Sequence, residues 1–516
     1  MKRYIVALTL IILSVTVSAQ GIFDALRYAD NSINGTARYM SMAGAFGALG
    51  GDASSIVDNP AGLGIYRSSE MTMTYNFMTV QSNSNWAEVA SSGTKFNFNI
   101  NNATLVFAYA DPIKEKGLVA SNFSFSYNRL KNFHRYVDIR GGASDNSMTD
   151  YMSTFTDDLG ESTLESYDPY NNINVPWLSE LAYQGYLINP GSGTDSLNWY
   201  SLLNNGETSN GRYKAVESGS IDEFGFNYGA NISNIVYFGL GFNLQTIDYA
   251  KTSVYGEIFE EGGNFALQNN FYTTGVGFNF KFGAIVRPTS FLRLGFAFHT
   301  PTYYSMTDRF YAEMDYDVVH VDNIRYIGTT QAPNGYASYR YRTPLKFQAS
   351  AGFIIGKSAI ISFDYMFTDY KGSTRLKEEV DYTNVLMEDD AYTLDNEDIN
   401  KYAVSGHTFK VGAEYRLSEL FSVRGGFAYQ TASVNADAVK LVPLNTIRTD
   451  MEYFKDQGSL YGTGGFGYRH DGFGVDLTYA FRQKKDLFKP YETADLLPAT
   501  VFTNTHNVVL SLSYRF

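Results

Sequence analysis

The chain has 516 residues, no cysteine and a formal net charge of -13, with 41 tyrosines and 38 phenylalanines against three tryptophans. The absence of cysteine excludes disulfides, a lipid-anchored cysteine and thiolate metal sites. The net acidity argues against nucleic acid as a partner. Many aromatic residues, together with 46 glycines and 12 prolines, favour a protein built from many strands that are joined by tight turns.

The N-terminus has the organisation of a secretory signal peptide. Lys2 and Arg3 precede an apolar run at residues 5–17, and small residues follow at Ser18 and Ala19. This pattern predicts a signal peptide over 1–19 and a mature chain that starts at Gln20. No other stretch approaches the roughly 18 apolar residues that a membrane helix needs. Any membrane-spanning structure must therefore be a closed barrel.

The last ten residues alternate strictly between two faces of a strand. Val508, Leu510, Leu512, Tyr514 and Phe516 fall on one face, and small or charged residues fall on the other. A period of two with one apolar face describes a strand between lipid and water. A soluble β-sandwich could contain one such strand, but an ending on a terminal phenylalanine is typical of bacterial outer-membrane barrels.

Fourteen amphipathic segments of this kind recur along the chain. They cover residues 70–80, 103–111, 119–135, 221–232, 236–250, 272–286, 291–304, 339–354, 358–370, 406–417, 420–431, 459–469, 473–483 and 506–516. Short links follow the even-numbered segments. Long links follow the odd-numbered ones, at 81–102, 136–220, 251–271, 305–338, 371–405, 432–458 and 484–505. This alternation predicts periplasmic turns, extracellular loops and both termini in the periplasm.

Residues 20–66 do not read as a strand. They are rich in glycine and alanine but also carry apolar residues such as Phe23, Met40 and Phe46. A flexible periplasmic leader is the simpler interpretation, but an apolar segment of this length beside a barrel is better placed inside it. Asn59-Pro60 is a turn signal that would end a short helix at about Val57.

One stretch of this segment carries a specific resemblance. Asp52-Ala53-Ser54-Ser55-Ile56, followed by Asn59-Pro60-Ala61-Gly62-Leu63, resembles the hatch of the FadL-type long-chain fatty acid transporter family. The resemblance implies an all-β transmembrane barrel of 14 antiparallel strands over 67–516, plugged by an N-terminal helical hatch over 20–66. It also implies that a set of hatch residues holds the plug together: Gly47, Gly50, Asp52, Asn59, Pro60, Ala61 and Gly62.

The family resemblance further implies a function, namely passive uptake of hydrophobic small molecules such as long-chain fatty acids or aromatic hydrocarbons. In that family the ligand leaves sideways through a gap that a kinked third strand makes in the wall. Here the apolar alternation breaks between Tyr127 and Phe133, and Asn128, Arg129 and Asn132 are the candidate kink residues. The alternative is that the strand simply leaves the membrane at this point.

The long link at 136–220 leaves the function open. It contains a predicted helix over 177–187 that could form a capture groove or merely cap the barrel. It would also suit a related barrel that acts as a protein-secretion or surface-assembly partner instead of a lipid transporter. Acidic runs at 378–381, 388–390 and 395–398 are expected to be solvated loop surface. The alternative is that they bridge divalent cations to lipopolysaccharide or bind Ca²⁺ loosely.

Chemistry of other kinds finds no support in the sequence. The six histidines are scattered, no paired metal-ligand spacing occurs, and there is no nucleophile elbow. We therefore expect no enzymatic activity, no metal and no cofactor. The expected partners are a hydrophobic ligand and the lipids and lipopolysaccharide of the bacterial outer membrane, and the protein is expected to be a monomer. The residues that bind the ligand stay unknown at this stage.

Overall fold

The structure is a computed structural model that describes residues 21–30, 32–111, 113–165, 175–193, 197–204, 206–320, 323–378, 392–440, 442 and 446–516. The predicted signal peptide at 1–19 and the acidic residues at 379–390 lie outside the described residues. Within the described residues, no helix is long and apolar enough to cross a membrane.

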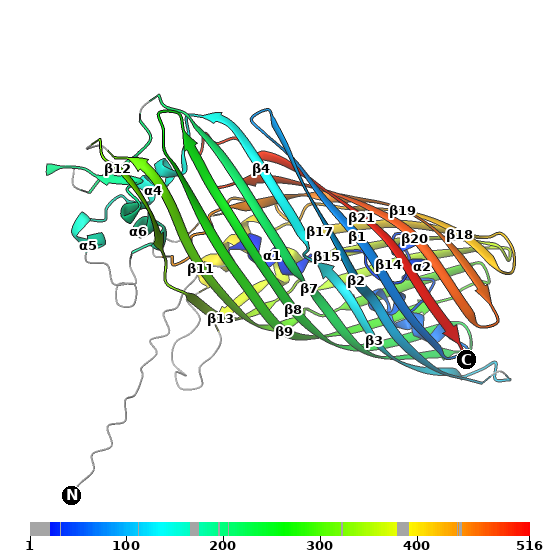
Figure 1. The fold of residues 1–516 in the computed structure, drawn as a ribbon. Coiled ribbons are helices and arrows are strands. Elements are labelled where there is room, and N and C mark those ends of the chain that lie inside the picture. The colour runs from blue at the N-terminus through cyan, green and yellow to red at the C-terminus, as the bar shows by residue number, and fades with distance from the viewer. Residues whose placement is uncertain are drawn as a thin grey trace, which may run out of the picture.

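The wall is a closed antiparallel barrel of 14 strands, as the sequence predicts (Figure 1). Ten are continuous: β1 (Glu70–Trp86), β2 (Val89–Ala110), β7 (Ser209–Ile232), β8 (Val236–Phe259), β9 (Asn264–Val286), β17 (Gly406–Arg416), β18 (Phe421–Gln430), β19 (Tyr453–His470), β20 (Phe473–Lys489) and β21 (Ala499–Arg515). Four are interrupted: β3 (Leu118–Asn132) with β4 (Arg135–Ser144), β10 (Leu292–His299) with β11 (Tyr303–Val319), β13 (Gly335–Arg342) with β14 (Lys346–Ile355), and β15 (Ala359–Thr368) with β16 (Arg375–Glu378). The C-terminal strand β21 closes the barrel because it pairs with both β20 and β1.

Shorter elements lie inside the barrel and at one of its ends. The helices before the first wall strand are α1 (Ile22–Ala29), α2 (Ala37–Ser41), α3 (Ser55–Asp58) and η1 (Pro60–Ile65). Two further helices, α7 (Tyr370–Ser373) and α8 (Thr393–Tyr402), lie between β15 and β17. The elements at the end of the barrel are α4 (Met148–Thr156), α5 (Glu161–Glu165), α6 (Trp177–Gln184), β5 (Ile188–Pro190), β6 (Trp199–Ser201) and β12 (Arg325–Gln331). In Figure 1, α4 to α6 stand at the end opposite to the C-terminus, and α1 lies within the barrel.

A belt of exposed aromatic residues surrounds the barrel. Its members lie on successive strands at similar exposure, and they include Phe98, Phe125, Phe226, Phe280, Phe296, Phe347, Phe363, Phe409 and Phe427. A soluble protein rarely exposes a contiguous apolar surface of this size. A belt of this kind is the lipid-facing surface of a transmembrane barrel.

Several strands extend beyond the predicted segments. The link predicted at 81–102 is the upper part of β1 and β2, which meet in a tight turn at Ala87 and Glu88, both with positive φ. The link at 251–271 is likewise mostly strand, since β8 continues to Phe259 and β9 begins at Asn264. The sequence analysis missed these extensions because no sustained alternation of outward-facing apolar residues runs through them. Phe96 and Phe98 are exposed on β2, whereas Tyr255 of β8 and Phe265 of β9 are buried on the inner face, and backbone pairing continues throughout.

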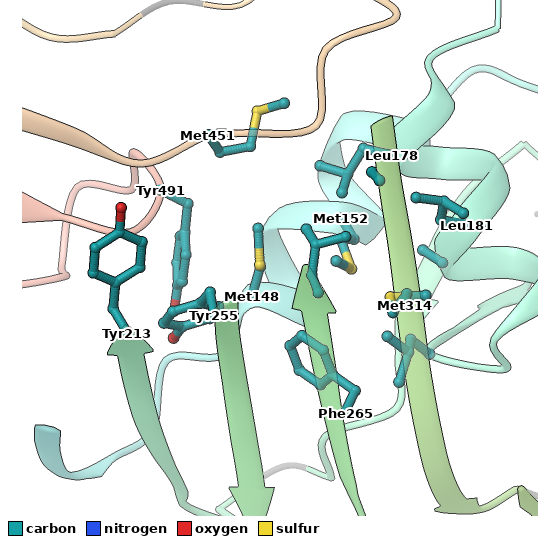
Figure 2. Packing of buried hydrophobic residues seen from close by; sticks show 14 of the residues in the cluster. Met148, Met152, Leu178, Leu181, Tyr213, Tyr255, Phe265, Met314, Met451 and Tyr491 are labelled. Carbon is teal, nitrogen blue, oxygen red and sulfur yellow. The ribbon is translucent and has the colours of Figure 1, made fainter. Parts of the chain in front are cut away.

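The segment after β4 folds into a cap on the barrel mouth (Figure 2). Met148 and Met152 of α4 and Leu178 and Leu181 of α6 pack with aromatic residues of the wall strands, such as Tyr255. The predicted helix over 177–187 ends earlier, at Gln184, because the chain reverses at Tyr186, where φ is 58°. The apolar face of the cap is thus buried against the barrel.

One buried carboxylate of the cap makes its stability depend on pH. Burial raises the pKa of Glu180 in α6 to about 7, and the side chain of Gln184 is its hydrogen-bond donor. An unfolded glutamate has a pKa of about 4.3. The folded cap therefore holds the proton more tightly, so its stability is greatest at low pH and falls as pH rises from about 4.3 to about 7.

We expect hydrogen–deuterium exchange of α6, corrected for the intrinsic rate, to speed up between pH 5 and pH 7.5. The variant Glu180→Gln, which stays neutral, should keep the slow exchange across this range. If the variant and the original chain show the same pH dependence, Glu180 is not the responsible group.

Candidate ligand route through the barrel

The hatch is seated on the wall through residues of the predicted motif. The side chain of Asn59 donates to the Gly47 carbonyl at 2.7 Å and accepts from the Ala61 backbone N–H at 3.1 Å. Its position fixes the turn into η1, where Pro60 occupies the first helical position. The backbone N–H of Gly47 in turn donates to Asp364 on β15 at 2.9 Å.

Two further motif residues close the hatch upon itself. Gly50 has a φ of +59°, and a Cβ there would lie 2.6 Å from the Cα of Gly62. Asp52 accepts from the Thr36 hydroxyl at 2.8 Å and from the Ser54 backbone N–H at 2.9 Å. The structure thus brings all seven hatch residues together, and short-range turns account for most of their contacts.

Glycines of the wall receive the hatch, and the sequence analysis did not identify them. A Cβ on Gly239 of β8 would collide with the backbone of Pro60 and Ala61, and one on Gly283 of β9 would collide with Asn59. Both glycines lie on lumen-facing positions of strands that are otherwise rich in aromatic residues. Glycine within a strand marks a close approach of another backbone, and this was the available signal.

The third wall strand is broken where the predicted kink lies. Pairing between β2 and β3 ends at Asn102–Asn128. Residues 129–132 of β3 have no backbone pairing with β2 among the described residues. The register with β7 shifts between Arg129 and Lys131. After this shift, the consecutive residues Lys131, Asn132 and Phe133 all line a cavity in the lumen. After the break, β4 passes on the lumen side of β2, since a Cβ on Gly93 would lie 2.9 Å from the Tyr136 carbonyl.

The three predicted kink residues surround this break in different ways. Asn128 is the last residue of β3 that pairs with β2. The guanidinium of Arg129 forms an ion pair with Asp222 of β7 at 2.9 Å. The side chain of Asn132 donates to that of Asn97 on β2 at 3.0 Å and so bridges the opening.

The hatch is hydrogen-bonded to the same break. The backbone N–H of Ser32 donates to the Leu130 carbonyl at 3.2 Å, and the Asn34 side chain reaches the same oxygen at 3.5 Å. The ammonium of Lys131 donates to the Arg27 carbonyl at 2.8 Å. A displacement of α1 or of the segment after it would therefore disturb the broken strand directly.

A cavity of about 210 Å³ lies between α1 and the wall and reaches the break. Its apolar lining includes Phe23, Leu26, Phe133, Val434, Phe454 and Phe481. Its basic lining consists of Arg27, Lys131, Arg135, Lys251, Lys440, Arg482 and Lys484. The sequence offered no sign of these basic residues, because they come from α1, from several wall strands and from the loop before β19, and they meet only inside the barrel.

Most of these basic residues are engaged in ion pairs. Arg135 pairs with Glu217 at 2.7 Å, Lys484 with Asp486 at 2.9 Å, and Lys131 with Asp30 of the hatch at 3.7 Å. The cavity is thus amphipathic, and both α1 and the wall contribute apolar and charged side chains to it.

A segment from the loop before β19 closes the cavity from the side of the cap. Arg448 forms ion pairs with Asp24 of α1 at 3.3 Å and with Asp450 at 2.5 Å, and Lys251 of β8 pairs with Asp450 and Glu452. Burial would raise the pKa of Asp24, but Arg27 and Arg448 outweigh it and hold the pKa below its ordinary value. This buried network, here called the latch, ties the loop to the hatch.

The described residues contain no cluster of three or more metal-ligating side chains. The acidic residues at 395–398 fall on α8, where Asp395 is buried. The described geometry therefore offers a channel-like route with a plug, a cavity and a broken wall strand.

Comparison with solved structures identifies this architecture. A Pseudomonas aeruginosa FadL homologue matches over 94% of this chain and 99% of its own, with a TM-score of 0.51 and 13% identity. The chain has the FadL-type fold. The Pseudomonas putida toluene transporter TodX matches this FadL-type barrel over the same shares, with a TM-score of 0.51 and 10% identity. No protein-family model and no curated protein matches the sequence.

Proposed function

We propose that this FadL-type barrel lies in the bacterial outer membrane, with both termini on the periplasmic side, and passively imports hydrophobic small molecules. Long-chain fatty acids and aromatic hydrocarbons are the proposed ligands. The ligand enters the cavity beside α1 and leaves sideways between β2 and β3. The proposal rests above all on one observation: the cavity beside α1 reaches the point where the β2–β3 pairing stops.

The physical properties of the route favour this ligand class. Each methylene that leaves water for an apolar pocket gains about 0.8 kcal/mol, and Phe23, Leu26 and Phe454 supply such a surface. The basic residues that line the cavity can exchange their present carboxylate partners for the carboxylate head group of a ligand. On the outer face, Phe96 and Phe98 of β2 are exposed next to the opening, so a ligand that leaves there enters lipid without crossing water.

A reversible cross-link across the opening tests lateral exit. The chain has no cysteine, so Asn97→Cys with Asn132→Cys introduces a single reactive pair on either side of the gap. We expect a short reducible bis-thiol cross-linker to lower uptake of a radiolabelled fatty acid at least about tenfold, because the exit is held shut. Reduction of the cross-link should restore uptake.

The pair Ser84→Cys with Ser91→Cys is the matched control. Its hydroxyls lie 2.8 Å apart within the β1–β2 hairpin, so a cross-link there leaves the gap free and should not change uptake. Full uptake through the cross-linked 97–132 pair would contradict lateral exit. Absence of fatty-acid and aromatic-ligand binding by the folded, unmodified barrel would contradict hydrophobic import itself.

The alternative function, as a partner in protein secretion or surface assembly, has weaker support. It needs an exposed platform on the 136–220 segment, whereas α4 and α6 turn their apolar residues onto the barrel strands (Figure 2).

A further inference from the structure

A second cavity, of about 110 Å³, lies on the other side of the hatch segment Ser32–Asn34. The two cavities share this segment and the neighbouring part of β3, so a small solute in one can approach the other. The second cavity is bounded by the hatch around Asp58 and by the wall where β10, β13 and β15 end.

The wall strands that are interrupted here supply polar groups. Thr300 and Thr302 flank Pro301, and Thr343 precedes Pro344 on the neighbouring strand. The Thr302 backbone N–H donates to the Thr343 hydroxyl at 2.8 Å. Proline has no N–H to donate, so hydroxyl groups replace part of the backbone ladder and line the cavity.

Three lysines face this cavity, and two have carboxylate partners. Lys281 pairs with Glu223 at 2.6 Å, and Lys410 pairs with Asp58 at 2.8 Å. The ammonium of the third, Lys346 at the start of β14, has no hydrogen-bond or ion-pair partner among the described residues. His299, the cross-strand neighbour of Lys346, bonds the Asp58 carbonyl through Nε2 at 2.7 Å.

The charges of this lining leave one positive charge without a match. An ammonium group inside a protein is costly unless an anion or several hydrogen bonds satisfy it. The carboxylates that line the cavity, Glu223 and Asp58, are already held by the other two lysines. Asp30, which also acts on Lys346, is paired with Lys131 and Arg482. A single negative charge on a small ligand would complete the set.

We propose that this cavity binds a small organic carboxylate, with its carboxylate on Lys346 and its body among the threonine side chains. A long alkyl chain does not fit this proposal, because the cavity is small and most of the residues that line it are polar. This site is distinct from the larger cavity of the proposed hydrophobic route. The inference therefore does not require that route to conduct fatty acids.

The probe for this site is 4-fluorobenzoate, with neutral 4-fluorobenzamide as its isosteric comparison, observed by ¹⁹F NMR on the purified full-length barrel. We expect saturable binding of the benzoate and at least about tenfold weaker binding of the benzamide. Lys346→Gln should weaken benzoate binding by a similar factor because a charge-assisted hydrogen bond is lost. Lys346→Arg should retain most of it.

Lys485→Gln on the exposed outer face of β20 removes the same charge outside the cavity and should leave benzoate binding unchanged. Equal binding of benzoate and benzamide, or equal benzoate affinity of Lys346→Gln and the original barrel, would overturn the proposal. Fatty-acid uptake by Lys346→Gln is measured in parallel. Its loss would concern the hydrophobic route, whereas its retention with lost benzoate binding separates the two sites.

Discussion

Replacement of Gly239 by valine is expected to unseat the hatch and open the barrel to small solutes. A Cβ at this position would collide with the backbone of Pro60 and Ala61, and backbone cannot rotate away as a side chain can. Overpacking of this kind costs about 1–3 kcal/mol. Because β8 pairs on both sides, we expect the wall to hold and the hatch to move. Conductance of the purified barrel in planar bilayers should rise from closed to open-channel levels.

Gly462→Val is the matched control for this prediction. Gly462 is also a wall glycine, on β19, but an added Cβ has no heavy atom within 4 Å. Its barrel should stay closed. Both variants should show the heat-modifiable migration of a folded barrel, so that a change in conductance reports on the hatch. A closed Gly239→Val barrel would mean that the hatch adapts to the added side chain.

Replacement of Arg448 by methionine is expected to release the latch between the loop and the hatch. Arg448 is buried and holds both Asp24 and Asp450. Removal of one partner from a buried ion pair costs up to about 3–5 kcal/mol. Arg27 and Lys251 still compensate Asp24 and Asp450, but the link between the loop and the hatch is lost. We expect hydrogen–deuterium exchange to accelerate by two or more orders of magnitude in α1 and in the described residues 446–452, while the wall strands keep their protection.

Two further variants make this result specific. Arg325→Met breaks an ion pair with Asp317 that lies on the exposed β11–β12 hairpin, and such surface pairs contribute little, so α1 should exchange as before. Arg448→Lys keeps a positive charge between Asp24 and Asp450 and should retain part of the protection. Unchanged exchange of α1 in Arg448→Met would show that the latch does not hold the hatch.

Local pattern in the sequence was sufficient for the wall. Each of the 14 predicted segments coincides with a wall strand, because lipid on one side and lumen on the other impose a period of two on every strand. The strand extensions at 81–102 and 251–271 escaped prediction because this period of two is not sustained through them. The turns of the hatch were also visible, as Asn59 and Pro60 act over a few residues.

What faces the lumen was decided only by the tertiary structure. Arg448 meets Asp24, and Lys346 faces the hatch, across hundreds of residues of sequence, so no spacing in the chain announces these contacts. The break in β3 was visible as a lost alternation, but its proximity to the hatch at Leu130 was not. The sequence by itself determined a plugged 14-stranded barrel because membrane and turn preferences act locally. Closure of the wall decided which charges, cavities and glycines share the lumen, because lumenal partners come from strands that are far apart in the chain.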